Sequence, residues 1–323
     1  MKISIFSKAF AMAVSVMLLT GVVHAQQWPS KPIKMVVPFA PGGGADITAR
    51  VYADALQKIL GQSIVVENKA GAGGAIGANS VASSSPDGYT FLYTTPGQQM
   101  TLPFLVKKLG YDPDALIPVS QVSLAPSVLV VNSQLGIKNI DQFISYAKSR
   151  PGKLSFVSAG IGSSSHLNGE LLKNLAKIDV EHIPYKGTGE ALRDLVGGMG
   201  DFSIDTVGIY TAYIKDGRLT PLGVTTPFAV DILPNVHPLN KTISGFDASP
   251  VNYITAPRGT PDDIVRRMSA ALNQAAKESH VKSTLAAQGI VAVANTPEEM
   301  KTIVEKERRR WKGVIEEAGI QAQ

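Results

Sequence analysis

Two segments of this chain share one pattern, in which an apolar run passes through a loop of small residues into an amphipathic run. The first comprises residues 33–37, the loop 38–46 and a helical pattern that stops at Gly61. The second comprises residues 154–158, a Gly/Ser loop at 159–165 and another helical pattern. Glycine lets backbone N–H groups approach a bound group closely, and a helix N-terminus adds unpaired N–H groups and a positive dipole end. The pattern predicts two anion-binding loops. The competing interpretation is a plain strand-to-helix turn.

The alternation of strand and helix continues along most of the chain. Strands are predicted at 33–37, 64–66, 89–94, 127–131, 154–158, 180–184, 202–205, 219–225 and 251–255, and long helices at 46–60, 140–148, 262–277 and 297–317. Such alternation indicates an α/β fold with parallel strands, in which ligands bind beyond the carboxyl ends of the strands. The chain has 323 residues, of which 44% are hydrophobic. It is therefore long enough for two domains with packed cores.

The first 25 residues have the pattern of a secretory signal peptide. Lys2 and Lys8 form a basic start, residues 9–23 are apolar, and Val23-His24-Ala25 fits a signal-peptidase site. We therefore predict a signal peptide at 1–25 and export to the periplasm. The alternative is that the same apolar run stays uncleaved as a membrane anchor. There is no cysteine, so disulfides, thiol nucleophiles and thiolate metal sites are excluded.

The charge pattern does not favour a nucleic-acid partner. The formal net charge is +5, and two of the lysines lie in the predicted signal peptide. The basic cluster at 306–310 is interleaved with glutamates, as is typical of a solvated helix face. The five histidines have no metal-binding spacing, and no phosphate-binding or dinucleotide fingerprint is complete. We expect no cofactor, no metal and no nucleic-acid binding.

Several short motifs occur in an order that is typical of one known family. They are Pro-Phe-Ala-Pro-Gly-Gly at 38–43 with Asp46 and Arg50, Glu67-Asn68 with the glycines at 71–74, Pro-Asp-Gly-Tyr-Thr at 86–90, Gly160-x-Gly162-Ser163 with His166, and Pro-Tyr-Lys-Gly at 184–187. They span nearly the whole chain after residue 25. In these motifs the chain resembles the extracytoplasmic receptors of tripartite tricarboxylate transporters, of the TctC or Bug type.

The resemblance implies a type II periplasmic-binding-protein fold, in which two α/β lobes close on one ligand. Lobe 1 would combine residues 26–125 and 250–323, and lobe 2 would be residues 126–249. The function implied is a monomeric solute-binding protein that captures a small organic acid and delivers it to a membrane transporter. The ligand-binding residues carried over from the family are Phe39, Pro41, Gly42, Gly43, Gly44, Asp46, Thr94, Thr95, Ser158, Ala159, Gly160, Gly162, Ser163, Ser164, Asp205 and Thr206.

Some residues depart from the family pattern or allow more than one role. The stretches at 98–100 and 237–240 are unlike those of relatives, so the sequence does not name the acid. A structural or water-ordering role is favoured for Asp46, since a free carboxylate would repel a bound one. Asp205 could accept a hydrogen bond from the ligand or cap a helix. We expect His166 to be packed or capping, and Arg50 to pair with an acid.

An enzyme of a different class is the second hypothesis, namely a periplasmic hydrolase acting on a carboxylated substrate. Ser145 and Lys148 satisfy S-x-x-K, but the motifs that accompany it in β-lactamases do not follow. The serines at 163–165 precede His166, and adjacent positions on a helix do not face one another. We therefore expect a binding protein rather than an enzyme.

Overall fold

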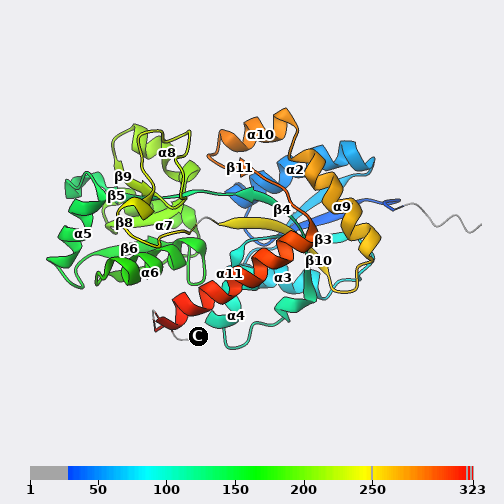
Figure 1. The fold of residues 1–323 in the computed structure, drawn as a ribbon, viewed down its shortest axis with the longest axis horizontal. Coiled ribbons are helices and arrows are strands. Elements are labelled where there is room, and N and C mark those ends of the chain that lie inside the picture. The colour runs from blue at the N-terminus through cyan, green and yellow to red at the C-terminus, as the bar shows by residue number, and fades with distance from the viewer. Residues whose placement is uncertain (1–27, 249, 318, 321, 323) are drawn as a thin grey trace, which may run out of the picture.

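The computed structural model describes residues 28–248, 250–317, 319, 320 and 322. The predicted signal peptide at 1–25 lies outside the described residues. The described chain forms two β-sheets with helices packed around each, arranged side by side (Figure 1). The α/β fold class and the two-lobed architecture are therefore confirmed.

The first sheet has six strands in the order β11-β4-β10-β3-β1-β2. Its strands are β1 (Ile33–Val37), β2 (Ile64–Asn68), β3 (Thr90–Thr94), β4 (Leu116–Leu124), β10 (Val251–Pro257) and β11 (Val291–Ala292). β1 pairs in parallel with β2 and β3, as predicted, whereas β10 is antiparallel to β3 and β4. The first loop (residues 38–46) and Thr95 therefore lie at the same carboxyl edge of this sheet.

The second sheet has five strands in the order β7-β6-β8-β5-β9. Its strands are β5 (Ser127–Asn132), β6 (Ser155–Ser158), β7 (Glu181–Pro184), β8 (Phe202–Thr206) and β9 (Leu219–Val224). β6 is parallel to β7 and β8, and β5 is antiparallel to β8 and β9. The second loop (residues 159–165) follows β6, so it lies at the same edge as Thr206, which ends β8.

Amphipathic helices cover both sheets. They are α2 (Gly44–Leu60), α3 (Ala75–Ala82), α4 (Leu102–Leu105), α5 (Ile140–Lys148), α6 (Ser164–Ala176), α7 (Thr188–Gly197), α8 (Val207–Lys215), α9 (Asp262–Ala275), α10 (Ser279–Ala286) and α11 (Pro297–Glu317). α2 buries Ala49, Tyr52 and Leu56 against the first sheet. It ends at Gly61, whose φ of 68° is left-handed and needs a residue without Cβ.

Three segments join the two halves of the molecule. The chain crosses at Ala125 and Pro126, between β4 and β5, and again before β10. These crossings lie side by side, because the Ala125 N–H donates to the Pro250 carbonyl at 3.2 Å. The third segment is α11, which runs from the first sheet to the second (Figure 1). Its Trp311 and Ile315 belong to one buried cluster with residues of both halves, so the hydrophobic core is continuous along α11.

Candidate ligand-binding site

The first loop presents an open helix N-terminus. Pro41, Gly42 and Gly43 are exposed, and Gly43 is the N-cap of α2 without a capping side chain. A Cβ placed on Gly43 would meet only the Ala40 carbonyl oxygen, at 4.0 Å. Within the described residues, no hydrogen bond is donated by the N–H of Gly44 or by the next amide. The loop therefore offers backbone N–H donors at the start of α2, and none of its own side chains covers them.

Asp46 lies inside the first loop. Its Oδ2 accepts from the Gly42 N–H at 3.0 Å, and its Oδ1 accepts from Asn68 Nδ2 at 2.9 Å. Arg50 Nε donates to both carboxylate oxygens at 3.0 Å, which confirms that Arg50 pairs with an acid. Burial alone would raise the pKa of Asp46, but these hydrogen bonds and the Arg50 charge lower it below the ordinary value. The carboxylate thus holds the loop in shape, and its contact with a ligand stays a prediction.

The second loop uses several of its amides internally. The bonds run from Ala159 N to Ser165 Oγ at 3.0 Å, from Gly160 N to Ser158 Oγ at 3.1 Å and from Gly162 N to His166 Nδ1 at 3.2 Å. The sequence predicts free amides in this loop, and these three are not free. The Ser163 hydroxyl is also engaged, because it accepts from the His166 N–H as the N-cap of α6. The backbone N–H groups of Ser164 and Ser165 have no partner within the described residues.

Two histidines lie behind the second loop, and the sequence analysis missed one of them. Ser158 Oγ is 2.6 Å from Nε2 of His182, which lies on β7. Burial, and then the charge of Lys173, lower the pKa of His182 to about 4. Burial, and then His182 and Lys173, lower the pKa of His166 to about 3. Both rings are therefore neutral at pH 7. A lone histidine on a strand gives no sequence signal, since its partner depends on the pairing of β6 with β7.

Asp205 and Thr206 end β8 beside the second loop. Asp205 is 9% exposed, and its Oδ1 accepts from the Thr206 N–H at 2.7 Å while its Oδ2 accepts from Thr188 Oγ1 at 3.2 Å. Burial raises the pKa of Asp205, although these bonds and one from Ser165 oppose the shift. The carboxylate therefore joins β8 to the start of α7. Thr206 remains partly exposed at the edge of the sheet.

The two predicted threonines after β3 have different environments. Thr94 is fully buried, and its hydroxyl lies 2.8 Å from that of Thr255 on the neighbouring strand. Thr95 is partly exposed, but its N–H and its hydroxyl both donate to Gln98 Oε1, at 2.7 and 3.0 Å. Gln98 lies in a single wide turn, η2 (Gly97–Thr101). Residues 98–100 are unusual for the family, but their sequence alone does not predict this contact.

Contacts between the two halves flank the loops on both sides. On one side, a Cβ placed on Gly97 would lie 3.9 Å from the Gly162 carbonyl oxygen of the second loop. On the other side, a Cβ on Gly208, in α8, would lie 2.5 Å from the Gln288 carbonyl oxygen. The two halves thus approach one another closely near Gly97 and near Gly208. The predicted site residues that are at least partly exposed are Phe39, Pro41–Gly44, Thr95, Ala159, Gly160, Ser163, Ser164 and Thr206.

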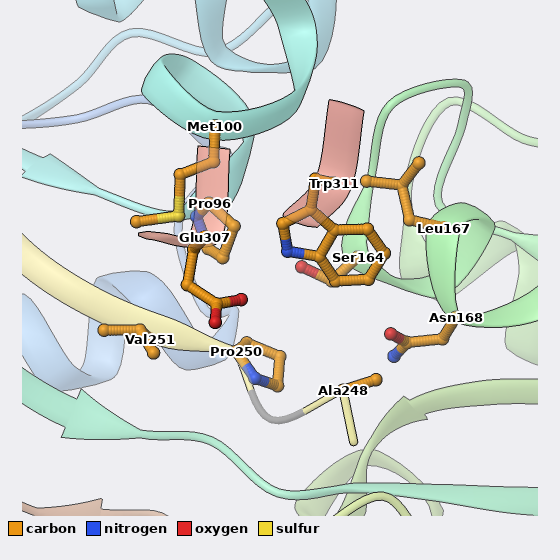
Figure 2. Close-up of a pocket in the computed structure, with 10 residues that line it drawn as sticks. All are labelled: Pro96, Met100, Ser164, Leu167, Asn168, Ala248, Pro250, Val251, Glu307 and Trp311. Carbon is orange, nitrogen blue, oxygen red and sulfur yellow. The ribbon is translucent and has the colours of Figure 1, made fainter. Parts of the chain in front are cut away.

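A narrow crevice lies where η2, α6 and α11 meet. Figure 2 shows the Trp311 ring between Met100 and Leu167, with the side-chain amide of Asn168 and the carboxylate of Glu307 turned toward the centre. Ser164 is the predicted site residue that lines it. The volume of the crevice is about 10 Å³, which holds no more than a water-sized molecule. The crevice is therefore too small for an organic acid in this conformation.

The described residues show neither a membrane-spanning helix nor a cluster of metal ligands. No described helix combines the length and the apolar content needed to cross a bilayer. No group of three or more potential metal-ligating side chains comes together in the described part of the chain.

Comparisons with known proteins agree with this geometry. Residues 48–320 match the family model described as the tripartite tricarboxylate transporter family receptor. The chain is 36% identical over 300 residues to protein BugT of Bordetella pertussis, an alignment that covers 92% of each chain.

Solved structures of related proteins have the same fold. The chain superposes on an R. palustris protein with adipate with a TM-score of 0.86 at 32% identity, covering 92% of this chain and 100% of that one. It superposes on MatC from Rhodopseudomonas palustris with bound malate with a TM-score of 0.81 at 32% identity, covering 89% and 100%. Both similarities extend across the two sheets.

Proposed function

This chain belongs to the tripartite tricarboxylate transporter receptor family, and from that premise we propose that it binds a small organic acid between its two halves. The main support for this proposal is the exposed first loop. There the first backbone N–H groups of α2 have no partner among the described residues. Amide dipoles at a helix N-terminus favour a carboxylate. Relatives with adipate and malate support this class of ligand.

The proposed site combines the first loop with the donors that remain free opposite it. Gly43 and Gly44 would hold one carboxylate through their backbone N–H groups, because the Gly42 N–H already donates to Asp46. Thr206 and the first turn of α6 would contact the remainder of the acid from the second sheet. Asp46 and Asp205 already have protein partners for their oxygens, so they would position the loops.

We propose that the halves are lobes comprising residues 26–125 with 250–323 and residues 126–249. The two adjacent crossings, joined by Ala125 and Pro250, would act as the hinge. Opening would expose the first loop, and closure would bring the second loop onto the bound acid. The loaded, closed form would then deliver the acid to a membrane transporter. We further propose that the protein is a periplasmic monomer.

We propose no catalytic role. Ser158 and His182 resemble a nucleophile and base by distance. However, Ser158 is only 1% exposed, and its oxygen already accepts from the Gly160 N–H. This pair shapes the second loop and has no access to a substrate in the closed form.

A thermal-shift screen of carboxylic acids tests the proposal, with amines and neutral sugars as comparison sets. Binding to the folded state alone raises the melting temperature. We expect at least one small carboxylate to raise it. A response to amines or sugars, with none to any carboxylate, would contradict the proposed function.

A further inference from the structure

The side chain of Gln98 occupies both donors of Thr95, a predicted site residue that follows β3. It is fully buried, and its Oε1 accepts from both the N–H and the hydroxyl of Thr95. Its Nε2 donates to the Gly73 carbonyl oxygen at 3.1 Å. All three bonds are made by the terminal carboxamide. The oxygen of Gln98 therefore takes two donors that could otherwise bind an oxygen of a ligand.

Gln98 lies where three loops converge. A Cβ on Gly74 would collide with Gln98 Nε2 and lie 3.2 Å from Pro38, the first residue of the first loop. A Cβ on the adjacent Gly97 would be 3.6 Å from the Gly73 carbonyl oxygen and 3.9 Å from that of Gly162 in the second loop. Gln98 thus lies near Pro38, where the first loop begins, and follows Gly97, which is close to the second loop.

We propose that Gln98 is a specificity-determining residue, whose carboxamide fills the Thr95 end of the cleft and limits the length of the acid bound there. This inference rests on the proposed function. Because an internal group already satisfies Thr95, the native site suits an acid that ends before this position. A longer acid would have to displace a buried carboxamide and leave the Gly73 carbonyl without its donor, which is unfavourable.

Replacing Gln98 with alanine would vacate a space with the shape of –CH2–CO–NH2. An acid extended by that arm could restore all three hydrogen bonds. An acid extended by –CH2–COO⁻ would restore the two bonds from Thr95, but its second oxygen would face the Gly73 carbonyl oxygen. The vacated space should therefore prefer an amide arm to a carboxylate arm.

The experiment compares matched acids on the native protein, Gln98→Ala and the control Gln142→Ala. Gln142 also accepts a backbone N–H through its Oε1, but it lies on α5, on the exposed surface. The matched sets are acetate, succinamate and succinate; propionate, glutaramate and glutarate; and butyrate, adipamate and adipate. Affinities are measured by calorimetry after a thermal-shift screen.

We expect Gln98→Ala to gain about tenfold or more for an amide-extended acid relative to its parent, with a smaller gain for the dicarboxylate. Gln142→Ala should keep the native ranking. If Gln98→Ala binds acids in the native order, Gln98 is only structural and the inference is wrong, while the proposed function stands. If neither protein binds any acid, both proposals are wrong.

Gln98→Glu provides a second test should Gln98→Ala fail to fold. It keeps the shape of the side chain but puts a negative charge at the end of the cleft. Acids should then bind about tenfold or more weakly, because like charges repel in a partly desolvated site. An unchanged affinity would place Gln98 outside the site.

Discussion

The imidazole rings of His166 and His182 are stacked, with centroids 4.2 Å apart and planes inclined by 24°. Phe156 continues the stack, 4.6 Å from His182. One ring nitrogen of each histidine contacts a group of the second loop or the strand before it. Burial disfavours a positive charge on either ring, and Lys173, which bonds Glu170, adds to this effect. The stack therefore supports the second loop only while both rings are neutral.

Acidification should destabilise the protein through this stack. A histidine in the unfolded chain has a pKa of about 6.5, above the folded values of about 3 and about 4. The unfolded state therefore takes up protons first, and stability falls as the pH drops from about 6.5 toward 4. At pH 5 the loss from His166 should be on the order of 2 kcal/mol.

Urea unfolding at pH 7.5 and pH 5 measures this effect. His182→Gln should weaken the dependence, because it removes one of the two buried rings, and the exposed control His280→Gln should leave it unchanged. Equal stability of the native protein at both pH values would show that the stacked rings do not titrate in this window.

Gly43→Val should abolish acid binding without unfolding the protein. The backbone of Gly43 is extended, with φ of −83° and ψ of 169°, so valine fits it, and the added side chain points into open space. It would cover the free amides of α2. Calorimetry should detect no binding, while the free energy of unfolding changes by less than about 1 kcal/mol. Gly313→Val on α11, also in open space, is the control. Native affinity in Gly43→Val would remove the first loop from the site.

Asp46→Asn should loosen the first loop. It removes the charge that binds Arg50 and the Gly42 N–H, so unfolding at pH 7 should become about 1–3 kcal/mol easier. Because the pKa of Asp46 is lowered by folding, this contribution is present above its unfolded pKa of about 3.9 and disappears as the pH falls through the folded pKa. The difference from the native protein should therefore shrink in acid. Asp54→Asn, exposed on the same helix, should have little effect at either pH.

Gly208→Ala should hinder closure. The new Cβ would lie 2.5 Å from the Gln288 carbonyl oxygen of the other half. Alanine favours the helix itself, so the unliganded protein should be no less stable, while acid affinity falls about tenfold. Small-angle scattering should show a larger radius of gyration. Gly189→Ala, at the corresponding second position of α7 and with nothing within 4 Å, is the matched control. A native affinity for Gly208→Ala would mean that this contact is not needed in the bound state.

Elements with a strong local pattern were predicted well. β1, α5 and α11 have the predicted limits, and Gly61 ends α2 as expected. β4 was missed, because Pro118 and two serines interrupt its apolar pattern. Ser120 and Ser123 are nevertheless fully buried, and Ser120 bonds the distant Asn295 carbonyl. α8 and α10 were also not predicted.

The candidate site was predictable only where it is local. The first loop is one continuous segment, and Asp46 and Arg50 are four residues apart on α2, so spacing sufficed. The contacts of His182 with Ser158 and of Gln98 with Gly73 depend on strand pairing and loop packing. Free amides in the second loop were wrongly expected for Ala159, Gly160 and Gly162, because nearby side chains satisfy them. Composition and spacing do not show which backbone amides a nearby side chain will bond.

Because α11 packs on both halves, it holds them together along one edge of the molecule. Asn174 on α6 still reaches Glu317 near the end of α11, at 3.1 Å. Any rotation that kept this edge intact would separate the opposite rim most, near Gly208 and Gln288. Solute should then enter and leave from that rim, and a transporter that distinguishes loaded from empty receptor would gain most by contacting it there.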